Sequence, residues 1–326
     1  MVQLRALSKI WLDGRLVPWE EAKVHVLAHG LHYGYAVFEG IRSHATARGP
    51  AIFRLDDHLA RFADSAKIYR MRLPYTVAEL KEACCELVRA NGVPDVYLRP
   101  IAFSGYGAMG LDPRECPIET AVAAWSWGGL FAGPGAAKGI RATVSSWVRI
   151  DSRSLPPQAK CSANYANGAL AKLEATAGGF DEAILLNSAG FVAEGPGENI
   201  FRVKNGVVST PPASSGILRG ITRDTVIRLA LEDGTHLERQ DFTREELFTA
   251  DELFFAGTAA GIVPIREVDG RPIGTGKYPV AASLGARYEA LVRGEAVGHP
   301  EWFTPVGPAG AVAAAPVRPA GRRAAH

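Results

Sequence analysis

A run of small, flexible residues interrupts the chain from Gly128 to Gly139. It contains five glycines and one proline, Pro134. Such a composition is typical of a connection between domains rather than of a helix or a strand. The whole chain has 326 residues, which is long for a single hydrophobic core. We therefore expect two domains, at residues 1–127 and 140–303, joined by a linker at 128–139.

Local patterns predict that both domains mix helices and strands. Asp13-Gly14 predicts the turn of a hairpin over residues 9–18. Residues 29–42, rich in glycine and aromatic residues, are expected to form a loop that leads to a strand. A capping box at Thr76 to Glu79 predicts the start of a helix that ends at Asn91-Gly92. Further strands are predicted at 51–55, 95–103, 118–126, 140–147, 183–186 and 252–256, and further helices at 56–69, 221–232, 243–250 and 277–293.

Two expectations concern packing and the end of the chain. In the helix at 56–69, the periodicity places four apolar residues toward the core, namely Leu59, Phe62, Ala66 and Ile68. The tail at 304–326 consists mainly of Ala, Pro, Gly and Arg. It has too little apolar surface to offset the entropy lost on ordering, so we expect it to be disordered.

The composition excludes several classes of protein. Hydrophobic residues make up 47% and charged residues 21%, as in an ordinary globular enzyme. The net charge of +2 gives no electrostatic reason to expect binding to nucleic acid or an anionic membrane. No apolar run approaches the roughly 20 residues that span a bilayer, and the N-terminus lacks the apolar segment of a signal peptide. The four cysteines show no metal-ligand spacing, which favours reduced thiols in the cytoplasm.

The stretch from Leu155 to Phe201 contains the most distinctive chemistry. Lys160 stands there among small and apolar residues, with no carboxylate nearby in the sequence. Desolvation disfavours an ammonium group, so such a lysine loses its proton more readily and can attack aldehydes. Tyr165 follows it, and Glu194 lies in a glycine-rich loop after an apolar strand. A carboxylate can keep a pyridine nitrogen protonated, so lysine, tyrosine and glutamate together suit a site for pyridoxal 5'-phosphate (PLP).

A PLP site also needs a cradle for the phosphate. Residues 214–222, Ser-Ser-Gly-Ile-Leu-Arg-Gly-Ile-Thr, form a loop of mostly small residues that runs into a predicted helix. The N-terminus of a helix offers unpaired N–H groups and a favourable dipole to an anion. Thr258, in a loop after an apolar strand, could add a hydroxyl and another N–H. An ordinary loop, with Thr222 helping to cap the helix, explains the same residues.

Each of these residues also has a plainer explanation. Lysine is usually a solvated surface residue, and a buried tyrosine is usually part of the core. Glu194 and Glu198 sit next to glycines and fit solvated turns equally well. His29 and His32 lie three residues apart, but no second group of ligands accompanies them, so no metal site is predicted.

Two arginines have the same ambiguity. Arg61 and Arg99 could both be surface charges. Arg99, however, follows an apolar segment, Val96-Tyr97-Leu98, where an unpaired guanidinium would be costly.

Taken together, these residues resemble the fold-type IV PLP enzymes and, within them, the branched-chain amino acid aminotransferases. The resemblance covers about residues 8–295. It implies an α/β fold, with a mixed α/β N-terminal domain and a larger PLP-binding domain that contains a pseudo-barrel of strands. The matching motifs, in chain order, are His32-Tyr33-Gly34, Val37–Arg42, Asp64–Arg70, Tyr97–Pro100, Ala159-Lys160, Asn164-Tyr165, Glu194-Gly195, Gly197–Asn199, Gly220–Asp224 and Gly257–Ala260.

The resemblance implies a set of contacts to the cofactor. Lys160 would be the catalytic residue, which forms the internal aldimine and then moves the proton of the 1,3-shift. Glu194 would pair with the pyridinium nitrogen and Tyr165 with the phenolic oxygen. Arg61, the backbone of Ile221 and Thr222, and Thr258 would hold the phosphate. The remaining cofactor-binding residues implied are Glu198, Asn199, Leu218, Gly220 and Gly257.

The resemblance also implies how carboxylates of the substrate are held. Tyr97 and the amides of Ala259 and Ala260 would grip the α-carboxylate. Arg99 and Tyr33 would meet the side-chain carboxylate of glutamate, with Tyr33 reaching in from a second subunit.

An aliphatic part of the pocket would be lined by Phe38, Trp127 and Met109 or Leu111. The implied reaction is ping-pong transamination of the branched-chain L-amino acids Leu, Ile and Val with 2-oxoglutarate, which gives branched-chain 2-oxo acids and L-glutamate. The implied protein is cytoplasmic and at least a homodimer.

Other functions fit the same residues. Aminodeoxychorismate lyases and aminotransferases of D-amino acids or amines resemble the chain at the lysine and the glutamate, but usually differ at Tyr97-Leu98-Arg99. A non-catalytic PLP-binding protein is the other alternative, and it is disfavoured because every expected catalytic position is filled.

Overall fold

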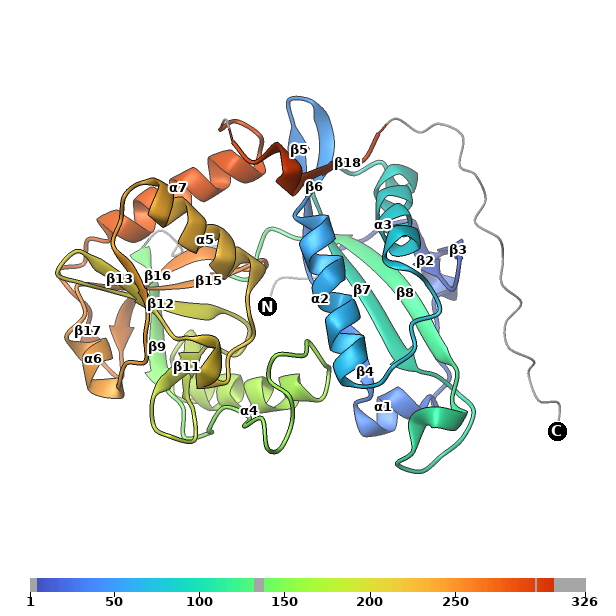
Figure 1. Cartoon of the computed structure of the whole chain (residues 1–326), viewed down its shortest axis with the longest axis horizontal. Helices are drawn as coiled ribbons and strands as arrows, with labels where there is room; N and C mark the ends of the chain where they lie inside the picture. The colour runs from blue at the N-terminus through green and yellow to red at the C-terminus, as the bar shows by residue number, and fades with distance from the viewer. Residues whose placement is uncertain (1–4, 132–137, 297, 308–326) are drawn as a thin grey trace.

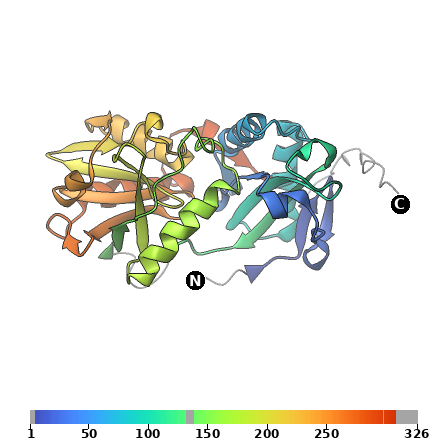
Figure 2. The ribbon, with the colours of Figure 1, turned by 90° about the horizontal axis from the view of Figure 1, so that it is seen from below.

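The computed structural model describes residues 5–131, 138–296 and 298–307. Within these residues the strands form two sheets of nine strands each (Figure 1). We call the first sheet with its helices the first lobe, and the second sheet with its helices the second lobe. Figure 2 shows the two lobes side by side, with α4 (Asn164–Ala177) along one face of the second lobe.

The first lobe is an antiparallel sheet with two long helices against it. Its strands follow the order β18-β6-β5-β7-β8-β2-β3, with β1 beside β8 and β4 beside β7. The strands are β1 (Arg5–Ala6), β2 (Lys9–Leu12), β3 (Arg15–Pro18), β4 (Ala36–Phe38), β5 (Ile41–Thr46), β6 (Gly49–Phe53), β7 (Val96–Ser104), β8 (Ile118–Ser126) and β18 (Phe303–Pro305). The helices are α1 (His29–Tyr33), α2 (Leu55–Ile68) and α3 (Val77–Asn91).

The second lobe contains a closed ring of six strands. Its sheet follows the order β11-β10-β9-β16-β15-β12-β13-β14, with β17 beside β16, and a further pairing of β11 with β12 closes the ring. The strands are β9 (Ile140–Val144), β10 (Glu182–Leu186), β11 (Val192–Glu194), β12 (Asn199–Lys204), β13 (Val207–Thr210), β14 (Leu237–Arg239), β15 (Glu252–Gly257), β16 (Gly261–Val268) and β17 (Arg271–Pro272). Its helices are α4, α5 (Ile221–Glu232), α6 (Arg244–Phe248) and α7 (Pro279–Val292). The pseudo-barrel expected from the resemblance is therefore present.

Hydrophobic clusters stabilise both lobes, and one of them also joins the lobes, because it contains a residue of β6 together with residues of α5 and α7. In the first lobe, α2 and α3 bury Leu59, Phe62 and Leu87 against the sheet. In the second lobe, one cluster draws residues from all six strands of the ring. Another cluster packs α5 and α7 against β12 and β15, where the rings of Phe201 and Phe254 stack 4.9 Å apart.

Signals that act within a few residues are confirmed. Asp13 and Gly14 adopt positive φ angles of 43° and 89° in the turn between β2 and β3. Thr76 and Glu79 form the predicted capping box at the start of α3, and the helix ends at Gly92 with φ 65°. The remaining predicted strands and helices lie within a few residues of the observed ones.

Two expectations about local structure are wrong, and one helix was not predicted. Residues 29–33 form the short helix α1 rather than a loop, because the ring of His29 packs on that of Tyr33 one turn later and Gly34 ends the helix with φ 68°. Ile68, expected in the core, is 46% exposed at the last residue of α2. The sequence analysis also missed α4, whose N-cap, Ala163, makes no capping hydrogen bond.

The predicted tail begins too early. β18 pairs with β6 through Thr304 and Pro305, and Val306 is buried in the core of the first lobe. The expectation of disorder is therefore wrong for residues 304–306, since this short segment supplies both a strand and an apolar side chain. Residues 308–326 lie outside the described part of the chain, as do residues 132–137 of the linker.

The domain boundaries at 127 and 140 stay a proposal. The strand pairings support it, because every strand up to Ser126 belongs to the first sheet and the strands from Ile140 to Pro272 to the second. β18 would then return to the first domain. In the described ranges, no helix combines the length and apolarity needed to cross a bilayer.

Removing the ring of Phe254 should strongly destabilise the second lobe. Phe201 and Phe254 are fully buried and face each other across β12 and β15. We expect Phe254→Ala to lower the free energy of unfolding by about 3–5 kcal/mol, through lost burial and the cavity left behind. Leu231→Ala, at an exposed site on α5, should change it by less than about 0.5 kcal/mol. Urea unfolding measures both, and a similar small loss in the two variants would contradict the packing described.

Candidate functional site

The backbone of Lys160 is held against the first lobe. Its N–H donates to Ser65 Oγ of α2 at 3.0 Å, and its carbonyl accepts from the N–H of Phe38 at 3.0 Å. The N–H of Ser162 donates to the carbonyl of Ala36 at 2.8 Å. Residues 160–162 therefore lie alongside β4, although the chain before and after them belongs to the second lobe.

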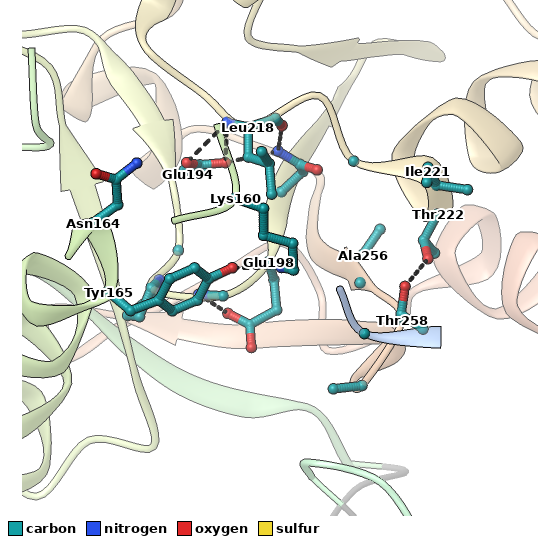
Figure 3. Close-up of a pocket in the computed structure, with 18 of the residues that line it drawn as sticks. Lys160, Asn164, Tyr165, Glu194, Glu198, Leu218, Ile221, Thr222, Ala256 and Thr258 are labelled. Carbon is teal, nitrogen blue, oxygen red and sulfur yellow. Dashed lines mark hydrogen bonds between the residues drawn. The ribbon is translucent and has the colours of Figure 1, made fainter. Parts of the chain in front are cut away.

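The side chain of Lys160 meets the hydroxyl of Tyr165. Nζ donates to this oxygen at 2.6 Å and lies 5.0 Å from the ring centres of both Phe38 and Tyr165. Tyr165 is in the first turn of α4. Beside it, the Asn164 amide donates to the carbonyls of Pro156 and Ala159 and so fixes the loop before Lys160. The amine and the phenol thus face the same cavity (Figure 3).

Glu194 ends β11 inside the same cavity and is surrounded by donors. One oxygen forms an ion pair with Arg149 Nε at 2.9 Å, and the other accepts from Asn199 Nδ2 at 2.9 Å. The N–H of Leu218 lies 3.1 Å from both oxygens. Burial raises the pKa of Glu194, and the charge of Arg149 and the amide of Leu218 act against this rise. The carboxyl is therefore held in place by several hydrogen bonds.

The N-terminus of α5 forms another end of the cavity. Its N-cap residue is Gly220, which offers no capping side chain. A Cβ on Gly220 would lie 2.0 Å from Asn199 Oδ1, so a larger residue does not fit. The hydroxyls of Thr222 and Thr258 lie 3.4 Å apart beside this helix end (Figure 3). Free N–H groups of the first helical turn and two hydroxyls together make a site suited to an anion.

Arg61 adds a positive charge at this end. Its Nε and Nη2 donate to the carboxylate of Glu39 at 2.7 and 2.8 Å, and its Nη1 donates to the carbonyl of Arg219 at 2.9 Å. Glu39 also contacts His58 Nδ1 at 2.7 Å. Burial alone would raise the pKa of Glu39, but Arg61 and His58 hold it well below its usual range. The guanidinium is thus fixed between the turn that follows β4 and the loop before α5.

One cavity brings most of the predicted residues together. Those that line it are Arg61, Tyr97, Lys160, Tyr165, Glu194, Glu198, Asn199, Leu218, Gly220, Ile221, Thr222, Gly257, Thr258 and Ala259. The lining also includes residues that the sequence analysis did not assign to the site, namely Gly40, Arg149, Pro157, Ala159, Asn164, Gly195, Pro196, Gly197 and Ala256. No local signal marks Arg149, because its place beside Glu194 depends on how the strands of the ring pair.

Comparison with known proteins agrees with this geometry. The family model described as class IV amino-transferase matches residues 36–268. The branched-chain-amino-acid aminotransferase of Pseudomonas aeruginosa is 46% identical over 296 residues, which cover 90% of this chain and 96% of that protein. The chain belongs to the class IV aminotransferases.

Solved structures show the same likeness. The branched-chain aminotransferase of Thermoproteus uzoniensis with norvaline is 46% identical, with a TM-score of 0.88 over 93% of this chain and all of that one. The branched-chain amino acid aminotransferase of Thermobaculum terrenum, solved in its PLP form, is 39% identical, with a TM-score of 0.86 over 93% of this chain and 99% of that one.

Beside the cavity of this class IV aminotransferase, Arg99 lies among aromatic rings. Tyr97 and Arg99 alternate on β7 and so share one face of the sheet. The guanidinium of Arg99 lies 4.7 Å from the ring centre of Phe38, 5.5 Å from that of Tyr97 and 5.4 Å from that of Trp125. Trp127 packs on Tyr97 at 5.0 Å. Among the described residues, Arg99 Nε has no hydrogen-bond partner.

Of the predicted substrate contacts, Tyr97 and Ala259 line the cavity, whereas Phe38, Arg99 and Trp127 lie in the aromatic group beside it. Four others do not line it either. Tyr33 is 40% exposed, Met109 52% and Leu111 83%. They lie close to one another in the first lobe, because His29 Nε2 contacts the carbonyl of Gly110 at 2.8 Å and so ties α1 to the loop that carries Met109 and Leu111. The fourth, Ala260, lies in the turn between β15 and β16. Within one chain, Tyr33, Met109 and Leu111 therefore do not reach the cavity.

Glu198 is a buried carboxyl in the lining that lacks a full set of partners. Its Oε2 accepts from the N–H of Gly197 at 3.2 Å, whereas Oε1 has no partner among the described residues. Burial, together with the negative charge of Glu182, raises the pKa of Glu198 to about 8. Glu182 itself is paired with Lys172 at 2.8 Å. At neutral pH the carboxyl of Glu198 is therefore mainly protonated.

Candidate metal ligands do not gather in the same way. Across the described ranges, no three His, Cys, Asp or Glu side chains converge on a point where they could hold a metal ion.

Glu198→Gln should change how stability depends on pH. The ordinary pKa of this carboxyl is 4.5, so between about pH 5 and 8 the folded protein binds a proton that the unfolded chain has lost. Its free energy of unfolding therefore falls as the pH rises through this window. A glutamine does not titrate, so the stability of the variant relative to the wild type should rise from pH 5 to 8, by at most about 1.4 kcal/mol per pH unit.

Urea unfolding of the cofactor-free protein between pH 5 and 8 measures this difference. The exposed substitution Glu295→Gln is the matched control and should leave the pH profile unchanged. The prediction would be contradicted if the free energies of unfolding of Glu198→Gln and the wild type differed by the same amount at every pH in the window.

Proposed function

We propose that this class IV aminotransferase uses PLP to transaminate the branched-chain L-amino acids Leu, Ile and Val, with 2-oxoglutarate as the amino acceptor. The observation that carries the proposal is the placement of Lys160, Tyr165 and Glu194 around one cavity whose far end is the N-terminus of α5. The P. aeruginosa relative, which bears the name of this activity, supports the choice of substrates.

The residues present fit the polar groups of PLP. A lysine amine suits its aldehyde, a buried carboxyl suits its ring nitrogen, and an anion site suits its phosphate. Lys160, Glu194 and the first turn of α5 would supply these three contacts, with Arg61, Thr222 and Thr258 also at the phosphate. When bound, PLP supplies an electron-accepting ring that stabilises negative charge at the substrate Cα.

Lys160 would then hold and move the proton at the substrate Cα. A neutral amine is a competent base, and the hydroxyl of Tyr165, 2.6 Å from Nζ, orients it. Glu194 would hold a proton at the ring nitrogen, since its carboxyl is fixed by Arg149, Asn199 and Leu218. Glu194 is buried, which limits competition from water at its carboxyl.

The surroundings of Arg99 suit a pocket that must accept two kinds of side chain. Phe38 and Trp127 offer apolar surface to a leucine, isoleucine or valine side chain. The guanidinium of Arg99, stacked among rings and with Nε free of partners among the described residues, suits the second carboxylate of glutamate. Tyr97 and the amides of Ala259 and Ala260 would take the α-carboxylate, which both kinds of substrate share.

A second copy of the chain would complete this pocket. The segment 24–33 and the loop 105–111 form one surface, which we call the α1 surface, held together by hydrogen bonds from His29 and His32. It exposes many large apolar side chains, namely Val24, Val26, Leu27, Leu31, Tyr33, Tyr106, Met109 and Leu111. Exposed apolar patches of this kind mark interaction surfaces. We propose a homodimer in which the α1 surface of one subunit covers the substrate side of its partner.

We also propose that the protein acts in the cytoplasm. All four cysteines are free and buried, which suits a reducing compartment.

Half-reactions on the PLP-loaded protein test the proposed function. L-leucine and L-glutamate should each bleach the visible absorption of the bound cofactor, and 2-oxoglutarate should restore it, because both amino acids can transfer their amino group. Bleaching by D-alanine or (R)-1-phenylethylamine alone would be consistent with the family but would contradict the proposed substrates. If none of these amines bleaches the absorption and the protein instead releases pyruvate from aminodeoxychorismate, the protein is an aminodeoxychorismate lyase.

Lys160→Ala should abolish the reaction in the same assay. The variant loses the amine that moves the Cα proton, so kcat should fall by on the order of 10⁴-fold or more. Lys81→Ala, which removes only a surface ion pair with Asp56, is the matched control and should keep full activity. Retained turnover in Lys160→Ala would show that another residue is the base.

Leu31→Glu should weaken the proposed dimer. Leu31 is 67% exposed on α1, so the charge is tolerated in a monomer but not in an apolar interface. We expect a shift from dimer to monomer in light scattering, together with a loss of activity. Leu231→Glu, at a site 54% exposed on α5, is the control and should remain dimeric. An unchanged dimer in Leu31→Glu would exclude the α1 surface as the interface.

A further inference from the structure

Arg54 is a buried arginine that lies close to the cavity but does not line it. It is the residue immediately before α2, with φ 51°, and its side chain is only 5% exposed. Its own N–H donates to the carbonyl of Trp302 at 2.6 Å, and its guanidinium lies 4.9 Å from the centre of the Trp302 ring. Both the backbone and the side chain of Arg54 are therefore fixed.

The guanidinium of Arg54 reaches across to the first turn of α5. Nη1 donates to the carbonyl of Ile221 at 3.3 Å, to Asp224 Oδ2 at 2.7 Å and to Thr225 Oγ1 at 3.1 Å. Its Nε donates to Asp57 of its own helix at 2.7 Å. One side chain thus connects the start of α2 with the start of α5.

An arginine within α2 contacts the same part of the chain. Arg61, seven residues after Arg54, donates to the carbonyl of Arg219. The two guanidinium groups therefore hold the chain on both sides of Gly220, the N-cap of α5. Since α2 buries Leu59 and Phe62 in the first lobe, the start of α5 is anchored to the core of the other lobe.

This arrangement matters because the first turn of α5 carries the proposed phosphate contacts. Backbone N–H groups bind an anion well only when they are held in the correct direction. The turn also carries Asp224, whose negative charge opposes an anion at the helix end. Arg54 offsets this charge on the buried side, and Arg228 offsets it on the solvent side at 2.9 Å.

We propose that Arg54 is a positioning residue for the phosphate group of the cofactor, which it serves by fixing the first turn of α5 without touching the cofactor. The inference rests on the proposed function, because that function identifies the anion as the phosphate of PLP. It assigns Arg54 a role separate from that of Arg61, which lines the cavity itself.

The test compares PLP with pyridoxal, which has the same ring and aldehyde but no phosphate. The full-length protein is stripped of cofactor, and the dissociation constants of both compounds are measured by fluorescence titration. We expect Arg54→Met to weaken PLP binding by about tenfold, the size of effect that follows from losing hydrogen bonds to a charged group, and to change pyridoxal binding by less than about twofold.

Two further variants make the test specific. Arg54→Lys keeps the charge but loses the planar fork, so it should weaken PLP binding by a few fold and leave pyridoxal binding unchanged. If Arg54→Met does not fold, the binding constants of Arg54→Lys still test the inference. Arg228→Met removes the other partner of Asp224 at a site 53% exposed, and should change both dissociation constants by less than about twofold.

The outcomes separate this inference from the proposed function. Equal weakening of PLP and pyridoxal in the Arg54 variants would mean a general structural role and would overturn the inference alone. Unchanged binding of both compounds would overturn it as well. A wild-type protein that binds no PLP would overturn the proposed function, and this inference with it.

Discussion

The position of the Lys160 amine, the proposed catalytic group, depends on contact between the two lobes. In the sequence, Lys160 lies between two elements of the second lobe, β9 and α4, yet its backbone is hydrogen-bonded to Phe38 and Ser65 of the first lobe. A buried backbone group left without a partner costs about 1–3 kcal/mol, so these bonds strongly favour one arrangement of the loop. Formation of the site and association of the lobes are therefore the same event, and neither lobe alone places the amine.

Two glycines set how closely the walls of the cavity approach each other. A Cβ on Gly40 would lie 1.9 Å from the hydroxyl oxygen of Tyr97, and one on Gly220 would lie 2.0 Å from Asn199 Oδ1. Gly40 is on the side of the proposed substrate contacts and Gly220 on the side of the proposed phosphate contacts. Neither glycine has a positive φ angle, so close packing rather than backbone freedom explains both. At both ends of the cavity, the walls can therefore lie this close together only because glycine has no side chain.

Features encoded within a few residues could be predicted from the sequence, whereas features that depend on pairing between distant segments could not. The capping box at Thr76 is local, and the prediction was accurate. The helix after Ala163 lacks such a start signal, and the sequence analysis missed it. Lys160 and Glu194 were recognised from the motifs around them, and the structure places both in one cavity. Arg149 was missed because it meets Glu194 only when the chain after β9 lies along β10 and β10 pairs with β11.

Closure of that ring has a consequence for local dynamics. β11 and β12 pair through Glu194 and Asn199, and the same two side chains are hydrogen-bonded to each other at 2.9 Å. The seam of the barrel is therefore also a wall of the cavity. Because a ligand that binds only the closed form stabilises it, occupancy of the cavity and transient opening of the seam are thermodynamically linked. Hydrogen exchange of the amides along this seam thus reports cofactor occupancy even though the seam is a structural part of the barrel.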